Sequence, residues 1–180
     1  CKLCYYAGHV EKYTEQQIYK MLTFIVLRAN KGGRVTIDVH GKENIPEKDG
    51  FMFFPNHQGM YDVLAIVEAC SHPFSVVAKK EVENVQFLKQ VFKCMKAYTM
   101  DRSDVRQAMK VITAVSKEVE NGRNYLIFPE GTRSKNGNHV QEFKGGSFKA
   151  ATKAKCPIIP VALIDSFKPF DTNSIEPVTV

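Results

Sequence analysis

Residues 51–62, FMFFPNHQGMYD, combine an apolar run, a proline and a polar loop. A short apolar run bounded by Gly50 and Pro55 is typical of a buried strand, because both residues interrupt a strand ladder. Gly59 permits a sharp turn, and the residues after it predict a helix that begins near Tyr61. We therefore expect a strand, a tight loop and a helix start.

His57 and Asp62 lie in this loop and helix start, just past the carboxyl end of the expected strand, where open α/β sheets bind their ligands. A helix that starts near Tyr61 lets the Asp62 carboxylate reach back to the imidazole. An Asp that accepts a hydrogen bond from one ring nitrogen fixes the tautomer and leaves the other nitrogen to take a proton from a hydroxyl. The pair is a candidate general base. Taken alone, it leaves open that His57 only closes a loop and Asp62 only caps a helix.

Apolar periodicity on both sides of this stretch predicts an α/β fold. Strand-like patterns occur at residues 34–39, 74–78, 97–100, 125–128 and 158–163, and helical spacing occurs at residues 10–30, 61–67, 82–95, 105–119 and 144–155. A βαβ unit is the simplest connection between the strands at 51–54 and 74–78. Asp104 and Gln107 predict a capping box, and Pro160 predicts an edge or bulge position. We expect a mostly parallel central sheet flanked by helices on both faces, preceded by an N-terminal helical segment.

The first helix, residues 10–30, has a continuous apolar part of about ten residues, whereas a helix needs about 20 to cross a bilayer. We therefore expect that it does not span a membrane. Lys12, Lys20 and Arg28 give it a basic flank, which suits either a helix packed on the core or an interfacial helix on anionic lipid. The chain begins at Cys1 rather than Met and stops after a strand-like segment, so we expect further sequence at both ends.

The composition indicates an anionic partner. The 180 residues include 25 Lys and Arg against 19 Asp and Glu, which gives a net charge of +6. Such a charge suits a nucleic acid, a phosphorylated small molecule or an anionic membrane surface. There is no dense basic block and no basic strand interleaved with aromatic residues, so we expect no nucleic acid partner.

The five cysteines are an odd number and are interpreted as reduced thiols in a cytoplasmic setting. Cys1 and Cys4 have the spacing of half a zinc site, but no Cys or His pair at a matching interval follows them. We therefore expect no metal.

Charged clusters follow separate apolar strands, and they consist of His57 with Asp62, Asp101 with Arg102, and Glu130 with Arg133. If these strands lie side by side and parallel, the clusters share one edge of the sheet. A base beside two guanidinium groups suits a substrate with a hydroxyl and a phosphate, because Arg grips phosphate oxygens with two hydrogen bonds. Gly131 and its neighbours can turn backbone N–H groups toward a developing oxyanion. Each Arg taken singly also fits a surface ion pair.

Residues 57–62 match a His-x4-Asp motif, residues 128–134 match Phe-Pro-Glu-Gly-Thr-Arg-Ser without a break, and residues 157–161 match the Pro-containing fourth motif of the glycerolipid acyltransferases. Over roughly residues 35–165 the chain resembles the PlsC-type 1-acyl-sn-glycerol-3-phosphate (lysophosphatidic acid) acyltransferases. The second motif departs from the family, because Lys96 stands in a Gly position and Thr99 in a Phe position. This departure bears on the identity of the acceptor.

The resemblance implies a role for each matching residue. His57 would be the general base on the acceptor hydroxyl, and Asp62 would orient it. The residues implied in substrate binding are Glu130, Gly131, Thr132, Arg133, Arg102 and Lys79. The acyl donor would be acyl-CoA or acyl carrier protein, with no cofactor and no metal. The product would be phosphatidic acid, formed at the sn-2 hydroxyl of 1-acyl-sn-glycerol-3-phosphate.

The resemblance also implies an organisation and a location. Residues 1–34 would be an N-terminal helical, membrane-associated segment, and residues 35–180 the acyltransferase domain. The protein would act at the cytoplasmic face of the cell membrane, peripherally or anchored by N-terminal helices. The alternatives are transfer to another lyso-lipid or to glycerol 3-phosphate, or a non-catalytic lipid-binding relative. An α/β hydrolase is the nearest rival enzyme, but no Gly-x-Ser-x-Gly elbow occurs.

Overall fold

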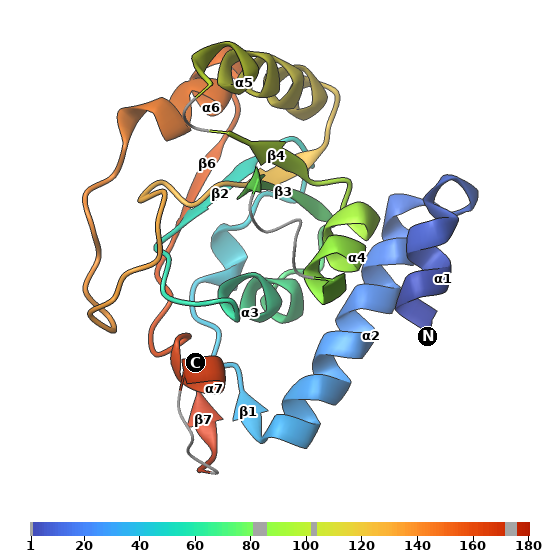
Figure 1. Cartoon of the computed structure of the whole chain (residues 1–180), viewed down its shortest axis with the longest axis vertical. Coiled ribbons are helices and arrows are strands. Elements are labelled where there is room, and N and C mark those ends of the chain that lie inside the picture. The colour runs from blue at the N-terminus through green and yellow to red at the C-terminus, as the bar shows by residue number, and fades with distance from the viewer. Residues whose placement is uncertain (1, 81–85, 102–103, 172–175) are drawn as a thin grey trace.

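The computed structural model describes residues 2–80, 86–101, 104–171 and 176–180, and its elements surround a parallel sheet (Figure 1). The sheet has five strands in the order β4-β3-β5-β2-β6. These strands are β2 (Met52–Pro55), β3 (Phe74–Lys79), β4 (Tyr98–Met100), β5 (Asn124–Leu126) and β6 (Ile158–Val161). Every pairing within the sheet is parallel. The predicted α/β class is confirmed, and β6, which contains Pro160, lies at an edge as predicted.

β5 lies between β2 and β3, which are therefore not neighbours although they follow one another along the chain. Met52 pairs with Tyr125 on one side of β5, and Ser75 pairs with the same residue on the other side. A simple βαβ unit is the expected connection between β2 and β3, but β5, which comes later in the chain, is inserted between them. As a consequence, the chain that follows β5 emerges beside the loop that follows β2.

Helices cover both faces of the sheet (Figure 1). Helices α3 (Asp62–Ala69) and α4 (Gln86–Cys94) lie on one face, and α5 (Val105–Glu120) and α6 (Lys149–Ala154) lie on the other. Alternate side chains of β2 supply the two cores, because successive residues of a strand point to opposite faces. Phe53 joins the core with α3 and α4, whereas Met52 and Phe54 join the core with α5 and α6.

The N-terminal region forms three helical elements rather than the single helix predicted for residues 10–30. These are α1 (Lys2–Gly8), the short 3-10 helix η1 (Val10–Lys12) and α2 (Glu15–Gly33). The break occurs because Thr14 has an extended backbone and caps α2, with reciprocal hydrogen bonds to Gln17. In the part of the chain that the structure describes, no helix combines the length and apolar character needed to span a membrane.

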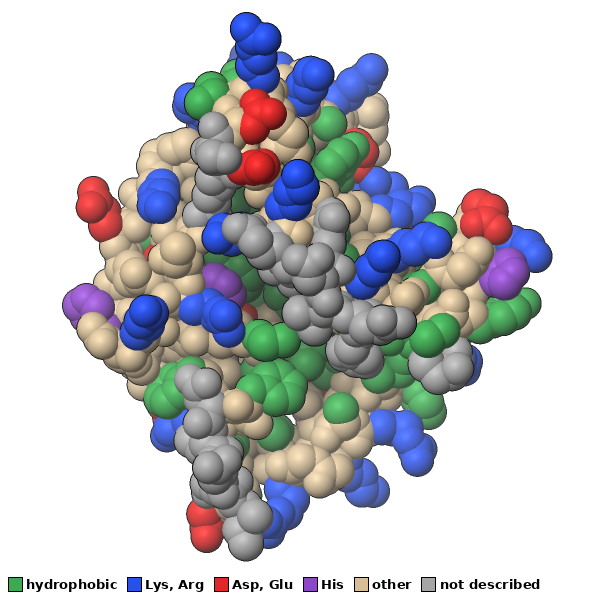
Figure 2. Space-filling view, in the orientation of Figure 1, with side chains coloured by type: hydrophobic (Ala, Val, Ile, Leu, Met, Phe, Trp, Pro, Cys, Tyr) green, Lys and Arg blue, Asp and Glu red, His purple; other side chains and the backbone are tan. Residues whose placement is uncertain are grey.

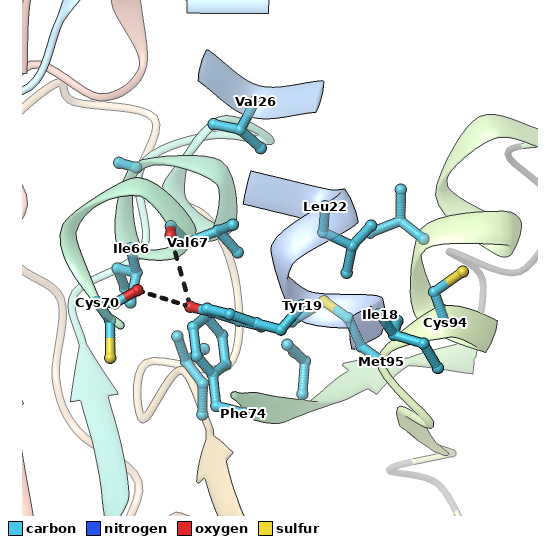
Figure 3. Packing of buried hydrophobic residues seen from close by; sticks show 14 of the residues in the cluster. Ile18, Tyr19, Leu22, Val26, Ile66, Val67, Cys70, Phe74, Cys94 and Met95 are labelled. Carbon is cyan, nitrogen blue, oxygen red and sulfur yellow. Dashed lines mark hydrogen bonds between the residues drawn. The ribbon is translucent and has the colours of Figure 1, made fainter. Parts of the chain in front are cut away.

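Helix α2 is joined to the sheet by apolar packing against α3 and α4 (Figure 3). Tyr19 lies at the centre of this cluster, and its hydroxyl lies 3.2 Å from the carbonyl oxygen of Cys70 and 3.5 Å from that of Val67, so it can donate to either. Burial of the phenol raises the pKa of Tyr19 well above its usual range. Helix α2 therefore shares one hydrophobic core with α3 and α4.

The alternating stretch at residues 34–39 does not join the central sheet. Only Val35–Thr36 form a strand, β1, which pairs in parallel with β7 (Val178–Thr179) in a separate two-stranded sheet. The strand is shorter than the predicted residues 34–39. Val35 and Ile37 are half-buried against the core, as the alternation predicted, but Val39 is 42% exposed. The remaining short elements are η2 (Lys42–Asn44), η4 (Gly145–Phe148) and α7 (Lys168–Asp171).

The predicted capping box of α5 is only half formed. Asp104 accepts a hydrogen bond from the backbone of Gln107 at 3.0 Å, as expected for an N-cap. The Gln107 side chain does not return to Asp104. It instead accepts from the backbone N–H of Asp101 and donates to the carbonyl of Thr99. Gln107 thus fixes the end of β4 rather than the start of its own helix.

Candidate active site

His57 and Asp62 meet as the sequence predicted. Asp62 is the first residue of α3, and its Oδ2 lies 2.7 Å from Nδ1 of His57. The Asp62 side chain is fully buried, whereas the His57 side chain is 21% exposed. Because Nδ1 faces the carboxylate, Nε2 is the ring nitrogen left to exchange a proton with a substrate.

The Asp62 carboxylate is held by its own loop and by a distant segment. Its Oδ2 accepts from the backbone N–H of Gln58 at 2.7 Å, and the N–H of Gly59 lies within 3.1 Å of both oxygens. The hydroxyl of Ser166 lies 2.7 Å from Oδ1. A buried carboxylate requires such hydrogen-bond donors, because moving the ion out of water without them costs on the order of several kcal/mol. The orientation of the acid is therefore determined before any substrate binds.

The chain after β5 fixes the imidazole. The ring of Phe128 stacks on the ring of His57, with centroids 3.8 Å apart and planes 18° apart. The backbone N–H of Ser134 donates to the carbonyl of His57 at 2.8 Å. These contacts depend on β5 lying next to β2, so the strand order brings the first and third motifs together.

Glu130 is buried beneath this loop, with 2% of its surface exposed. Its Oε1 accepts from the backbone N–H of His57 at 2.7 Å, and its Oε2 accepts from the backbone N–H of Gln141 at 3.0 Å. Both oxygens thus bind backbone, and the side chain joins three stretches of chain. This geometry favours a role in positioning His57 over direct contact with a substrate.

Gly131 turns the chain after Glu130 with a φ of +79°, a conformation that favours glycine. Its N–H donates to the carbonyl of Phe128 at 3.2 Å, so this group closes a turn and does not point at an oxyanion. The next two side chains, Thr132 and Arg133, are exposed. The carbonyl of Thr132 accepts from the Gln141 side chain at 3.0 Å, which ties down the loop that carries Arg133.

Lys79 ends β3 and is exposed at the same edge of the sheet. Asp101 follows β4 and is half-buried, whereas Arg102 lies outside the described residues. In the space-filling view, Lys and Arg side chains border a hollow in the middle of the face shown (Figure 2). The parallel strands therefore place the described members of all three charged clusters at their carboxyl ends.

Lys96, which stands in a Gly position of the family's second motif, lies at the other end of the sheet from His57. Lys96 precedes β4 at its amino end, and its Nζ approaches Glu15 of α2 at 3.3 Å. Its φ of +51° is in the left-handed region, where glycine is favoured. The Gly in the family motif thus has a backbone explanation.

Comparison with known proteins identifies the family. Residues 36–164 match the family model described as Acyltransferase. The chain belongs to the acyltransferase family. A 1-acyl-sn-glycerol-3-phosphate acyltransferase of Borreliella burgdorferi is 33% identical over 86% of this chain and 63% of its own length. One from Helicobacter pylori is 31% identical over 67% of this chain and 51% of its own length. The chain thus spans between half and two thirds of these relatives.

A solved structure supports the fold. The crystal structure of the 1-acyl-sn-glycerophosphate acyltransferase PlsC from Thermotoga maritima superposes with a TM-score of 0.77, at 22% identity over 98% of this chain and 71% of that one. The N-terminal helices and the sheet of this acyltransferase domain therefore form an arrangement that occurs in a known structure.

Sequence reasoning missed a group of buried polar residues behind the pair. Gln58 is 3% exposed and Ser166 is fully buried, and both contact the loop that carries Asp62. Asn56 has a similar role, because its side chain bonds the backbone N–H and carbonyl of Leu163 and joins the end of β2 to the chain after β6. Their residue types gave no signal, since buried and exposed polar residues look alike in a sequence.

Proposed function

We propose that this acyltransferase moves an acyl group from acyl-CoA or acyl carrier protein to the sn-2 hydroxyl of 1-acyl-sn-glycerol-3-phosphate, giving phosphatidic acid. The observation that carries the proposal is the partly exposed His57 ring, bonded at Nδ1 to the buried Asp62 carboxylate at 2.7 Å. The names of the relatives from Borreliella burgdorferi and Helicobacter pylori support the choice of acceptor.

The reaction begins when Nε2 of His57 takes the proton of the acceptor hydroxyl. The hydroxyl oxygen attacks the carbonyl carbon of the thioester, the new ester C–O bond forms, and the C–S bond breaks. The imidazolium then returns its proton to the departing thiolate. Asp62 stabilises the imidazolium and holds its tautomer. Among the described residues no Ser or Cys side chain bonds to the His57 ring, which supports direct transfer without an acyl-enzyme.

The remaining motif residues fall into two roles. Arg133 and Lys79 bind the acceptor phosphate, because Arg133 follows β5 and Lys79 ends β3 at the edge that carries His57. Arg102, which lies outside the described residues, is assigned the same role from its motif. Thr132 lies beside Arg133 on the same exposed turn and contacts the substrate. Glu130 and Gly131 shape this turn from beneath. The reaction requires no metal and no cofactor besides the acyl donor.

The proposed location is the cytoplasmic face of the membrane, with the N-terminal helices at the lipid surface. Phe24 and Leu27 on α2 are 51% and 47% exposed. The guanidinium of Arg28 lies 5.5 Å from the centre of the Phe24 ring, so basic and apolar groups occur together on this helix. Such a surface suits an interface with anionic lipid. Flotation with liposomes should require anionic lipid and weaken with salt, and equal flotation with neutral lipid would contradict this location.

A labelled acyl-donor assay with a panel of acceptors tests the activity. Transfer should be fastest to lysophosphatidic acid and slow to the matching acceptor without phosphate. Transfer confined to glycerol 3-phosphate or to another lyso-lipid would support the alternative acceptor. Absence of transfer from both acyl-CoA and acyl carrier protein, with lipid binding retained, would support a non-catalytic relative.

A further inference from the structure

Ser166 lies on the opposite side of Asp62 from His57 and belongs to none of the motifs. It follows β6, lies 104 positions from Asp62 in the sequence, and is fully buried. Its Oγ is 2.7 Å from Oδ1 of Asp62 and 2.9 Å from Oε1 of Gln58. A buried hydroxyl between two acceptors can give its single proton to one of them at a time.

The hydrogen-bond pattern assigns that proton to Asp62. The backbone N–H of Ser166 already donates to Oε1 of Gln58 at 3.0 Å, so this oxygen has a donor. A bond to a carboxylate is shorter and stronger than a bond to a neutral amide, and the contact with Asp62 is the shorter of the two. The same backbone donor fixes the amide of Gln58 with its oxygen toward Ser166 and its nitrogen away.

Further polar contacts anchor Gln58. Its Nε2 donates to Oδ1 of Asn138 at 2.8 Å, and Nδ2 of Asn138 donates to Asp165 at 3.0 Å. Lys168 bonds the other oxygen of Asp165 at 2.8 Å, and this bond holds the pKa of the Asp165 carboxyl below its usual range. An unbroken series of hydrogen bonds thus runs from the surface to the catalytic pair.

The backbone at Gly59 lies close to the backbone of Ser166 and Phe167. A Cβ added at Gly59 would lie 3.3 Å from the carbonyl oxygen of Ser166 and 3.2 Å from Cα of Phe167. Such distances are tight for a Cβ, so only glycine lets the two segments approach without a shift. The segment at 165–168 therefore presses directly on the loop whose N–H groups bind Asp62.

We propose that Ser166 is a positioning residue for the acyl transfer, acting through Asp62. Its hydroxyl holds Oδ1, so that Oδ2 stays aligned with Nδ1 of His57, and it withdraws part of the negative charge that the imidazole faces. Removing the hydroxyl should loosen the carboxylate and leave more charge toward His57. This inference rests on the proposed function for its kinetic readout, but its structural readout does not.

The kinetic test compares Ser166→Ala, Ser166→Thr and the matched control Ser75→Ala. Ser75 is also buried and donates its hydroxyl, to the carbonyl of Met95 at 2.6 Å, but in β3. In Ser166→Ala we expect kcat to fall about tenfold, as for loss of a hydrogen bond to a charged group, with KM for both substrates changed less than about twofold. Ser166→Thr should recover most of kcat, and Ser75→Ala should keep the parental value.

The pH profile separates positioning from a general loss of structure. The ionisable groups facing the cluster are His57, Glu130, Asp165 and Lys168. With more negative charge left on Asp62, protonated imidazole is favoured. The acidic limb of the pH–activity profile should therefore lie at a higher pH in Ser166→Ala than in the parent. An unshifted profile, with no recovery in Ser166→Thr, would overturn the proposal. So would a kcat loss no larger than in Ser75→Ala.

Proton NMR of the His57 Nδ1–H supplies the readout that needs no turnover. We expect its resonance to move, or to broaden by exchange, in Ser166→Ala but not in Ser75→Ala. If the parent shows no acyl transfer while this difference appears, the proposed function fails and the positioning role stands. If the resonance is unchanged, the positioning role fails whatever the activity. Should Ser166→Ala not fold, Ser166→Cys, which keeps the volume with a weaker donor, replaces it in both measurements.

Discussion

Among the described residues, two His–Asp pairs have the same short distance. Nδ1 of His57 lies 2.7 Å from Asp62, and Nδ1 of His72 lies 2.7 Å from Asp49. The side chains of the two histidines are similarly exposed, at 21% and 25%. The acids differ, because Asp62 is fully buried whereas the Asp49 side chain is 48% exposed.

The two pairs also lie at opposite ends of the sheet. His57 follows β2 at the carboxyl ends of the strands, whereas Asp49 precedes β2 and His72 precedes β3. Asp49 accepts a further bond from Asn124, at the start of β5, so this pair joins the amino ends of three strands. The contrast teaches that a short imidazole–carboxylate distance does not identify a catalytic base. The two pairs differ instead in the burial of the acid and in the end of the sheet at which they lie, and only His57 is at the carboxyl ends, where α/β sheets bind ligands.

The largest effect should come from replacing the two histidines in turn. His57→Ala should reduce turnover by about 10²–10⁴-fold, because it removes the group that accepts the proton. His72→Ala should leave turnover within about twofold, because its pair stands at the other end of the sheet. Steady-state kinetics with circular dichroism as a check of folding measures both. Turnover of His57→Ala within about tenfold of the parent would remove His57 from the role of base.

A smaller loss is expected from Asp62→Asn. The amide keeps the shape of the carboxylate but turns an N–H₂ group toward backbone donors at Gln58 and Gly59 or toward Ser166, so the His57 tautomer is no longer enforced. Activity should fall more than about tenfold yet exceed that of His57→Ala. Asp49→Asn is the matched control, because its acid is half-exposed, and it should retain parental activity. Equal kinetics in Asp62→Asn and Asp49→Asn would contradict the proposed difference between the two pairs.

Arg133 is an exposed cation on the loop that follows β5. Arg133→Ala should raise KM for the phosphorylated acceptor about ten- to a hundredfold, since a charge-assisted hydrogen bond contributes about 1.5–3 kcal/mol. KM for the acyl donor should change little, and Arg133→Lys should recover part of the loss, because Lys lacks the planar fork. Lys135→Ala removes an exposed cation from the same loop and serves as the control. Equal losses with an acceptor that lacks phosphate would assign Arg133 to the structure of the loop.

The smallest effect should be a change in stability at the second pair. His72→Ala removes the bond to Asp49 and an edge contact between the His72 and Phe51 rings, whose centroids are 5.6 Å apart. Because this pair is partly exposed, the free energy of unfolding should fall by about 1 kcal/mol or less. Thermal unfolding measures the change. An unaltered melting temperature would show that the second pair does not stabilise the fold.

Local patterns were sufficient for the strands, most helices and the first pair. The apolar run at 51–54 and the glycine at position 59 lie within a few residues of each other, and one turn of chain brings Asp62 back to His57. Such features depend on contiguous residues and are therefore readable. The same reasoning predicted too long a strand at residues 34–39, where Val35 and Ile37 are half-buried but only residues 35–36 form a strand.

The sequence alone therefore determined the α/β class and the residues of the candidate base, and it limited the strand with Pro160 to an edge or bulge position. Only the tertiary structure decided that β5 separates β2 from β3, that Glu130 lies beneath His57, and that Ser166 lies behind Asp62. The physical reason is the range of the interactions. Periodicity and turn chemistry act between neighbours in the chain, whereas strand order and buried hydrogen bonds join residues 73 to 104 positions apart, whose pairing no local pattern records.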